Sequence, residues 1–179
     1  KSVDVVIAVG YKSEQIKSYI SLIFKDRNIT FVDVKNYSEE GSGPGLSLLE
    51  CKRHLACPFI FTSADTLIED DYCFDKVTEN WIGGSYIDEE DSSMYSLIRG
   101  SKYLDEIYYG CGNMAFVGIA GIKEYKDFWR SLENRKIVKS EYQVTHAFSG
   151  LKKVRIYKLK SQTDELLALS KKVSLATKS

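Results

Sequence analysis

The feature that most constrains the fold is a run of β-branched and apolar residues, Val3–Val9, which only Asp4 interrupts and which ends at Gly10. Such a run is typical of a strand that is buried on both faces of a sheet. Apolar residues at helical spacing follow, with Ser13 as the expected N-cap. The stripe consists of Ile16, Tyr19, Ile20, Ile23 and Phe24. Because a second apolar strand, residues 29–34, comes next, the pattern predicts a right-handed parallel crossover.

Composition narrows the class of protein further. With 179 residues, 44% of them hydrophobic, the chain can bury one substantial core, and we expect a single domain over residues 1–179. Since 25 basic residues balance 25 acidic ones, no global field would attract nucleic acid or a membrane surface. No apolar stretch approaches the ~20 residues of a membrane span, so we expect a cytoplasmic protein. The sequence leaves open whether it forms a homo-oligomer.

The four cysteines and two histidines show no spacing typical of a zinc site, and no CxxC pair occurs. Three of the cysteines, Cys51, Cys57 and Cys73, lie within or beside apolar runs. This placement favours buried thiols in a reducing compartment over a disulfide framework.

Strands and helices continue to alternate along the chain. After a turn-rich loop at residues 36–45, we expect a helix, a short buried strand at residues 58–62, and then a more irregular region from Trp81 onward. Later strands are expected at 94–98, 107–109, 114–119 and 154–159, and helices at 123–132, 142–151 and 165–173. The alternation predicts an α/β protein: a Rossmann-like three-layer sandwich with a mostly parallel sheet and a small antiparallel excursion.

The first candidate site residue is Asp65, which comes just after the short buried strand. A carboxylate at the end of an apolar strand is costly unless a cation lies opposite it. Magnesium, with its preference for oxygen ligands, is the natural partner. The alternative is that Asp65 caps the turn or helix that follows by accepting backbone N–H bonds.

The second candidate is the loop Gly41–Gly45, which opens a helix. Its glycines would let backbone N–H groups approach a phosphate or the edge of a base. The loop does not match the P-loop pattern, and a plain connecting turn is the alternative. Because ligands of open α/β sheets gather at the carboxyl ends of the strands, we expect this loop and Asp65 at the same edge.

Three stretches together resemble a known family. They are VDVVIAVGYKSEQIKSYI, GSGPGLSLLECKRHL and PFIFTSADTLIEDD. Over most of its length the chain resembles the nucleotidyltransferases that include sugar-1-phosphate nucleotidyltransferases and phosphocholine cytidylyltransferases. In this comparison the stretches are similar to the family's second strand and helix, its nucleobase loop and its metal-aspartate strand. The later stretches FVGIAGIKEYKDFWRSL and SEYQVTHAFSGL are similar to the wall of its acceptor pocket.

The resemblance implies a role for each candidate residue. Asp65 would bind Mg²⁺ and carry the chemistry, Gly118 and Glu141 would approach the acceptor, and Asp164 would be a second metal ligand, although it lacks the glycine of the family motif. The nucleotide would lie against Ser42, Gly43 and Gly45. The substrates would be a nucleoside triphosphate and a phosphorylated sugar or phosphocholine-like acceptor, with pyrophosphate released.

One part of the family pattern has no counterpart in the chain. The family opens with a strand and a glycine-rich loop whose Arg and Lys hold the triphosphate, whereas this chain begins near the family's second strand. We therefore expect the first strand to be missing, and the chain to be either a fragment or a copy unable to turn over.

Two other functions fit the same sequence. A glycosyltransferase with a nucleotide-sugar donor would normally have a second acid two residues after Asp65, where this chain has Leu67. A non-catalytic binding or assembly module would keep the fold without the triphosphate loop.

Overall fold

The computed structural model describes residues 4–66, 77–134, 137–138 and 140–159. The chain divides into two compact units, which are described separately: Lys1–Cys57 with Tyr125–Gly150, and Pro58–Glu124 with Leu151–Ser179. Whether they make one domain stays a prediction. None of the helices in these described ranges has the length and apolar character needed to cross a membrane.

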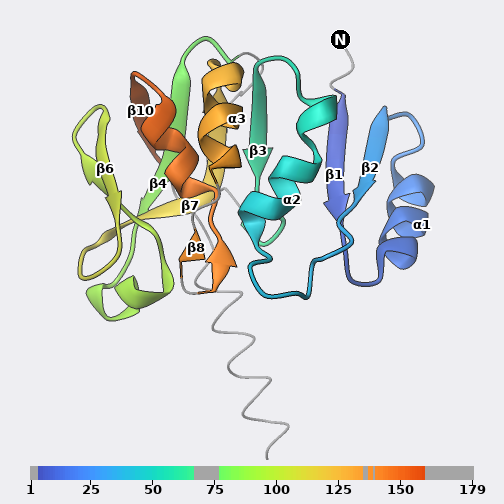
Figure 1. The fold of residues 1–179 in the computed structure, drawn as a ribbon, viewed down its shortest axis with the longest axis horizontal. Helices are drawn as coiled ribbons and strands as arrows, with labels where there is room; N and C mark the ends of the chain where they lie inside the picture. Colours follow the sequence, from blue (N-terminus) through green and yellow to red (C-terminus); the bar gives the residue numbers. More distant parts are fainter. Residues whose placement is uncertain (1–3, 67–76, 135–136, 139, 160–179) are drawn as a thin grey trace, which may run out of the picture. The chain divides into compact units, whose positions relative to one another are not determined.

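The first unit begins with the expected crossover (Figure 1). Strand β1 (Val5–Val9) pairs in parallel with β2 (Ile29–Asp33), and helix α1 (Ser13–Ile23) connects them. The strand–helix–strand unit predicted from the apolar pattern is therefore confirmed. The other elements of this unit are α2 (Pro44–Glu50), the 3₁₀ helix η1 (Lys52–His54), α3 (Tyr125–Glu133), β8 (Ile137–Val138), β9 (Glu141–Tyr142) and the 3₁₀ helix η3 (Thr145–Gly150).

Helix α1 differs from its prediction at its start and in its burial. Lys12 occupies the N-cap position in the left-handed conformation, and no side chain caps the helix, so the expected cap by Ser13 is wrong. No residue of α1 is fully buried, and Ile20 is the one apolar residue within it that is half-buried. Amphipathic spacing predicts that a helix will form, but it does not say what covers its apolar side.

Helix α3 carries the core of the first unit. Phe128, Trp129 and Leu132 are buried, as their helical spacing predicted. The Trp129 indole N–H donates a hydrogen bond of 3.2 Å to the carbonyl of Leu55, so the one polar atom of this ring is satisfied. Phe128 packs edge-on against Phe148 of η3, with ring centroids 5.8 Å apart.

The prediction of a helix at residues 142–151 is wrong. Residues 141–142 form the strand β9, which pairs with β8, and a 3₁₀ helix follows only from Thr145. The physical reason is that Tyr142 has partners on other elements. Its backbone N–H donates to the carbonyl of Ser42 at 3.0 Å, and its hydroxyl donates to the carbonyl of Leu132. These two bonds hold Tyr142 extended, against the helix that its local spacing suggested.

The second unit is a mixed sheet. Its strands are β3 (Phe59–Thr62), β4 (Asn80–Tyr86), β5 (Leu97–Gly100), β6 (Leu104–Tyr108), β7 (Met114–Ile122) and β10 (Val154–Lys158). The order is β10-β4-β7-β5-β6, and β3 also pairs with β7. β3, β4 and β10 run in one direction, whereas β7 lies antiparallel to both β3 and β4. The α/β class is confirmed, but in this unit the ladders through β7 make the sheet mixed where we expected it to be mostly parallel.

Strand β4 was not expected as a long central strand because Gly83 and Gly84 interrupt its apolar pattern. Both glycines are buried in the sheet. A Cβ on Gly83 would lie 2.6 Å from Ile119, and one on Gly84 would lie 2.5 Å from Ile98. The glycines are therefore sites of close packing within a strand, which a local pattern cannot distinguish from turn glycines.

At the start of β4, the buried side chain of Asn80 has all its hydrogen-bonding capacity used. Its oxygen accepts from the backbone N–H groups of Lys123 and Glu124 at 2.9 and 3.0 Å. Its amide donates to the Glu124 carboxylate at 2.7 Å and to the carbonyl of Lys153 at 3.4 Å. A buried amide is stable in a core only when it is paired in this way.

The thiols differ in their environment, which gives a first prediction. Burial raises the pKa of the Cys51 thiol to about 11, whereas Cys57 and Cys111 are exposed. Since the thiolate is the reactive form, iodoacetamide at pH 8 should label Cys57 and Cys111 in the folded protein and leave Cys51 unlabelled. Peptide mass spectrometry would measure each site, and all should react in denaturant. Because the folded pKa of Cys51 is raised, stability should fall as the pH rises from about 9 toward about 11.

Candidate nucleotide site

The glycine-rich loop of the first unit lies against the short strand β9. The backbone N–H of Gly41 donates to the carbonyl of Ser140 at 3.2 Å, and the carbonyl of Ser42 accepts from the N–H of Tyr142 at 3.0 Å. Gly43 has a φ of 148°, and a Cβ there would lie 3.0 Å from the carbonyl oxygen of Tyr142. A Cβ on Gly45 would lie only 2.6 Å from that oxygen. The loop therefore needs glycine at positions 43 and 45, because its backbone there lies directly against the backbone of Tyr142.

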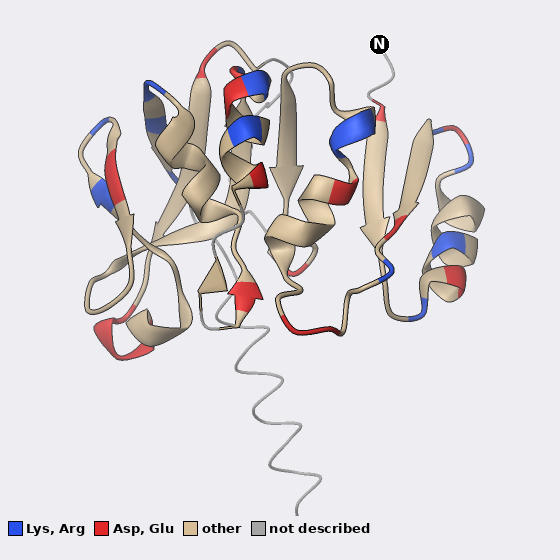
Figure 2. Cartoon of the chain, in the orientation of Figure 1, with Lys and Arg blue, Asp and Glu red and all other residues tan. Residues whose placement is uncertain are grey.

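Beside this loop is a hollow of about 250 Å³. It is lined by Asn36, Glu39, Glu40, Gly41, Ser42, Leu46, Glu50, Ile137 and Tyr142. Three of these residues are glutamates, and Figure 2 shows the acidic residues in the link between β2 and α2. These three carboxylates favour a group that donates hydrogen bonds and disfavour a phosphate close to them.

Glu141 lies next to the loop. The Cβ of Glu141 lies 3.3 Å from the position that a Cβ on Gly43 would occupy. Its carboxylate accepts a hydrogen bond of 2.9 Å from the side-chain amide of Gln143. The structure thus brings Glu141 together with Ser42, Gly43 and Gly45 within the first unit. Its role toward an acceptor stays a prediction.

In the second unit, Asp65 lies in the turn that directly follows β3, and its side chain is exposed. Among the described residues Asp65 makes no hydrogen bond or ion pair. The turn itself is held firmly on β7. The backbone N–H of Ser63 donates to the carbonyl of Gly118 at 2.9 Å, and the Thr66 hydroxyl donates to the carbonyl of Val117, also at 2.9 Å. A fixed backbone with an exposed carboxylate is suitable for binding a ligand.

Gly118 makes this attachment feasible. It has a φ of +79°, and a Cβ there would lie 2.4 Å from the Ser63 hydroxyl. It also lies in a bulge, because β4 advances two residues from Ile82 to Gly84 while β7 advances four from Ala120 to Phe116. Such a bulge turns backbone groups out of the ladder. Here the carbonyls of Val117 and Gly118 accept the two hydrogen bonds from the turn that carries Asp65.

At this turn Asp65 offers one exposed carboxylate to a magnesium ion. The ion usually binds one or two carboxylates and keeps water or substrate phosphate oxygens as its other ligands. Among the described residues no group of three or more His, Cys, Asp or Glu side chains could form a closed metal site. A single exposed carboxylate fits an ion that arrives with a triphosphate. Asp164, the predicted second ligand, lies outside the described residues.

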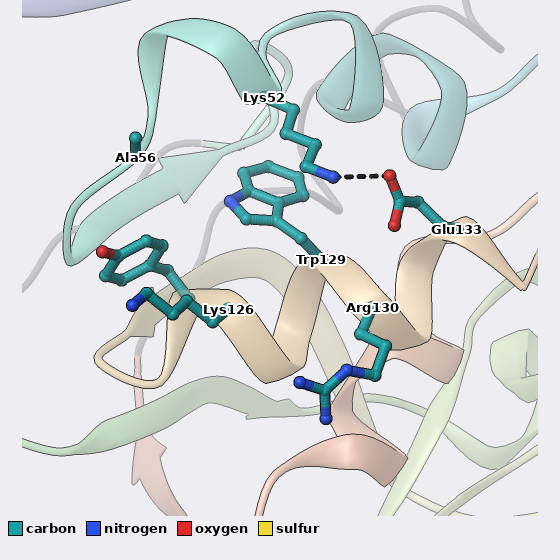
Figure 3. Close-up of a pocket in the computed structure, with 7 residues that line it drawn as sticks. Lys52, Ala56, Lys126, Trp129, Arg130 and Glu133 are labelled. Carbon is teal, nitrogen blue, oxygen red and sulfur yellow. Dashed lines mark hydrogen bonds and ion pairs between the residues drawn. The ribbon is translucent and has the colours of Figure 1, made fainter.

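A second hollow, of about 330 Å³, lies between η1 and α3 (Figure 3). Figure 3 shows Lys52 paired with Glu133. Outside the residues drawn there, Asp127 pairs with Arg130 at 3.1 Å. None of the predicted site residues lines this hollow. Carboxylates pair with two of its cations, Lys52 and Arg130.

Known structures show the same arrangement of elements. UDP-glucose pyrophosphorylase in complex with UDP-glucose matches with a TM-score of 0.72 and 18% identity, over 88% of this chain and 74% of that chain. CTP:phosphocholine cytidylyltransferase from Streptococcus pneumoniae matches with a TM-score of 0.64 and 17% identity, over 88% and 69%. HddC from Yersinia pseudotuberculosis matches with a TM-score of 0.58 and 14% identity, over 89% and 72%.

The chain has the fold of these nucleotidyltransferases. The resemblance seen in the sequence is thus confirmed at the level of the fold, which is that of nucleotide-diphospho-sugar transferases. No protein-family model matches the sequence, and no curated protein matches it. At these identities the comparison establishes the architecture, and the activity remains to be argued from the site.

The predicted site residues thus form two groups, one in each unit. Ser42, Gly43, Gly45 and Glu141 lie together in the first unit, and Asp65 lies beside the strand that carries Gly118 in the second. That the two groups face one ligand stays a prediction. Sequence reasoning missed Ser63 and Thr66, although they flank Asp65 closely, and it missed Ile137 and Tyr142, which are distant in sequence from the hollow they line.

The attachment of the Asp65 turn gives a second prediction. Replacement Gly118→Ala should lower the free energy of unfolding by about 1–3 kcal/mol through backbone strain and by about 1–3 kcal/mol more through the clash with Ser63. Gly110→Ala is the matched control, since Gly110 has a φ of +145° with nothing within 4 Å of the added Cβ. Urea unfolding would compare them. Equal losses, or no relief of the Gly118→Ala loss by Ser63→Gly, would contradict the assigned contact.

Proposed function

We propose that this protein transfers a nucleotidyl group from a nucleoside triphosphate to a phosphorylated small-molecule acceptor, a sugar phosphate or a phosphocholine-like compound, and releases pyrophosphate. The observation that carries the proposal is the glycine-rich loop packed on β9 beside an acidic hollow, within a fold shared with UDP-glucose pyrophosphorylase. The neighbouring structures support the general reaction, since their names describe enzymes that act on nucleotides.

In the proposed reaction a phosphate oxygen of the acceptor attacks the α-phosphorus in line. The new P–O bond forms as the bond between the α-phosphorus and the bridging oxygen breaks, and pyrophosphate leaves with that electron pair. Such a reaction needs no covalent intermediate on the protein, because positioning and charge neutralisation supply most of the rate. The loop at Gly43 and Gly45 would position the nucleotide, since its backbone lies close against that of β9.

Asp65 is the residue that would hold magnesium. When bound, the ion would draw charge from the triphosphate oxygens and so stabilise the departing pyrophosphate. The protein's part is to keep the carboxylate in place. The hydrogen bonds from Ser63 and Thr66 to β7 do this by fixing the turn on both sides of Asp65. The exposed carboxylate, without a partner among the described residues, is ready to accept a cation.

The acidic hollow would receive the part of the substrates that donates hydrogen bonds. Glu39, Glu40 and Glu50 would repel a phosphate, so the triphosphate would lie outside the hollow. A nucleobase edge with N–H groups, a sugar with hydroxyl groups or a cationic head group would each find acceptors there. The base and the acceptor are therefore best determined by a screen of substrates.

The proposal gives a third prediction, on Asp65. Asp65→Asn keeps the size of the side chain and removes the charge that binds magnesium. We expect magnesium-dependent pyrophosphate release by the full-length gene product to fall by about 100-fold or more, because a bound metal contributes several kcal/mol. Asp88→Asn, which removes another exposed carboxylate of the same unit, should change turnover less than about twofold. Full turnover by Asp65→Asn would contradict the proposed role.

A binding experiment separates this function from its two rivals. Isothermal titration with each nucleoside triphosphate and magnesium should give binding of one triphosphate, and pyrophosphate release should follow when the matching acceptor is added. Binding of a nucleotide sugar with no turnover of any triphosphate would instead indicate a glycosyltransferase. If no nucleotide bound, the chain would be a binding or assembly module on the same fold.

A further inference from the structure

The second hollow of the first unit, between η1 and α3, has more cations than carboxylates in its described lining. Three cations and one carboxylate are among these residues: Lys52, Lys126, Arg130 and Glu133. The other described lining residues are Ala56, Tyr125 and Trp129. The volume of about 330 Å³ lies at the lower end of the range for small-molecule sites, roughly 300–1,000 Å³. The hollow therefore has the size and the charge for a small ligand that carries an anionic group.

The chain itself neutralises these cations only in part. Lys52 pairs with Glu133, and Arg130 pairs with Asp127, but the side chain of Arg130 is 78% exposed. An ion pair this exposed contributes little to stability, so a ligand can replace it at low cost. Within the described part of the chain Lys126 makes no ion pair. Lys126 and Arg130 can therefore both turn to a bound anion.

Helical spacing brings these two cations together. Lys126 and Arg130 are four residues apart on α3, so they extend from the same face of the helix. Two like charges at this spacing repel each other, and an anion bound between them would remove the repulsion. A phosphate monoester suits the pair, because it carries up to about two negative charges near neutral pH and has three oxygens that accept hydrogen bonds.

An aromatic residue beside the cations is held in place by the core of the unit. The indole N–H of Trp129 donates to the carbonyl of Leu55 at 3.2 Å, and Phe128 and Leu132 of the same helix are buried. Figure 3 shows the indole ring between α3 and Lys52 of η1. Together with Tyr125 it offers an apolar wall, which favours an anion with an organic group over a bare inorganic ion.

The hollow is separate from the proposed nucleotide loop. Helix α2 begins in that loop, at Pro44, and η1 follows the other end of the helix, at Lys52. The seven residues of α2 span about 10 Å between the two places. A ligand in this hollow would therefore be a second ligand, bound in addition to the nucleotide.

We propose that this hollow binds a phosphate monoester of a sugar or a nucleoside. The phosphate lies between Lys126 and Arg130, and the organic group lies against Tyr125 and Trp129. Glu133 competes with the ligand, because it neutralises the third cation of the lining, Lys52. The proposal concerns binding alone, so it does not depend on the transfer reaction.

An NMR titration without magnesium tests the proposal. The chain has two tryptophans, so an isotope-labelled sample has two indole N–H signals, which Trp81→Phe or Trp129→Phe would assign. Glucose 1-phosphate, uridine monophosphate and inorganic phosphate are titrated separately. At least one ester should shift the Trp129 signal and leave that of Trp81, in the second unit, in place. Inorganic phosphate should bind at least about fivefold more weakly than that ester, because it has no group to bury. The tighter ester identifies the organic group.

Three variants test the assigned contacts. Lys126→Met should weaken binding of the ester about tenfold, since it removes a charge-assisted hydrogen bond. Lys25→Met, at another exposed lysine of the same unit, is the matched control and should leave the affinity unchanged. Glu133→Gln should tighten binding about threefold, because it removes the competing carboxylate. A loss of stability would not produce this opposite sign, and circular dichroism would show that each variant is folded.

Several results would overturn the proposal. One is the absence of any shift of the Trp129 signal by either ester at about 10 mM, well above the dissociation constant of a useful site. Others are an affinity that Lys126→Met leaves intact, or an unchanged or weaker affinity in Glu133→Gln. Equal binding of inorganic phosphate and both esters would overturn the assignment of an organic ligand.

Discussion

The second unit depends on strand β7, because its backbone hydrogen bonds hold three other strands and one turn in place. It pairs with β3, β4 and β5, all antiparallel. A regular strand would use every backbone group in these ladders and leave none for a neighbouring turn. At the bulge the carbonyls of Gly118 and Val117 accept hydrogen bonds from Ser63 and Thr66, and these bonds attach the turn that carries Asp65 to β7. Because Gly118 has no side chain, the turn with the proposed metal ligand can lie this close to the sheet.

The first unit uses the same principle at its glycine-rich loop. Gly43 and Gly45 let the loop approach the backbone of Tyr142 to a distance that a Cβ would prevent. Tyr142 in turn is buried and donates its hydroxyl hydrogen bond to Leu132 on α3. The loop is therefore supported by the core of its unit through a single aromatic residue. A binding loop held in this way loses little conformational entropy when a ligand binds, which favours affinity.

The sequence predicted these features unevenly, and the reason is the range of the interactions. The crossover of β1, α1 and β2, the burial of Phe128 and Trp129, and the loop before α2 all follow from local spacing, and all are confirmed. The helix expected at 142–151 failed because Tyr142 is held by Ser42, a hundred residues earlier. The bulge at Gly118 could not be predicted either, since a glycine in a strand has the same local pattern whether it packs, bends or bulges.

Charge distribution is the strongest restriction on what the loop of the first unit can bind. Had the glycine-rich loop been a general phosphate site, cations would be expected in the hollow beside it, because an anion gains most from charge-assisted hydrogen bonds. The described residues that line it include Glu39, Glu40 and Glu50, and none of the described lining residues is a lysine or an arginine. A ligand with an anionic part and a hydrogen-bond-donating part could place the donating part in the hollow, near the glutamates. Its anionic part would then lie outside the hollow. Nucleotides have this composition, with the base and sugar at one end and the phosphates at the other, so the glutamates among the described lining residues agree with the nucleotide proposed for this loop.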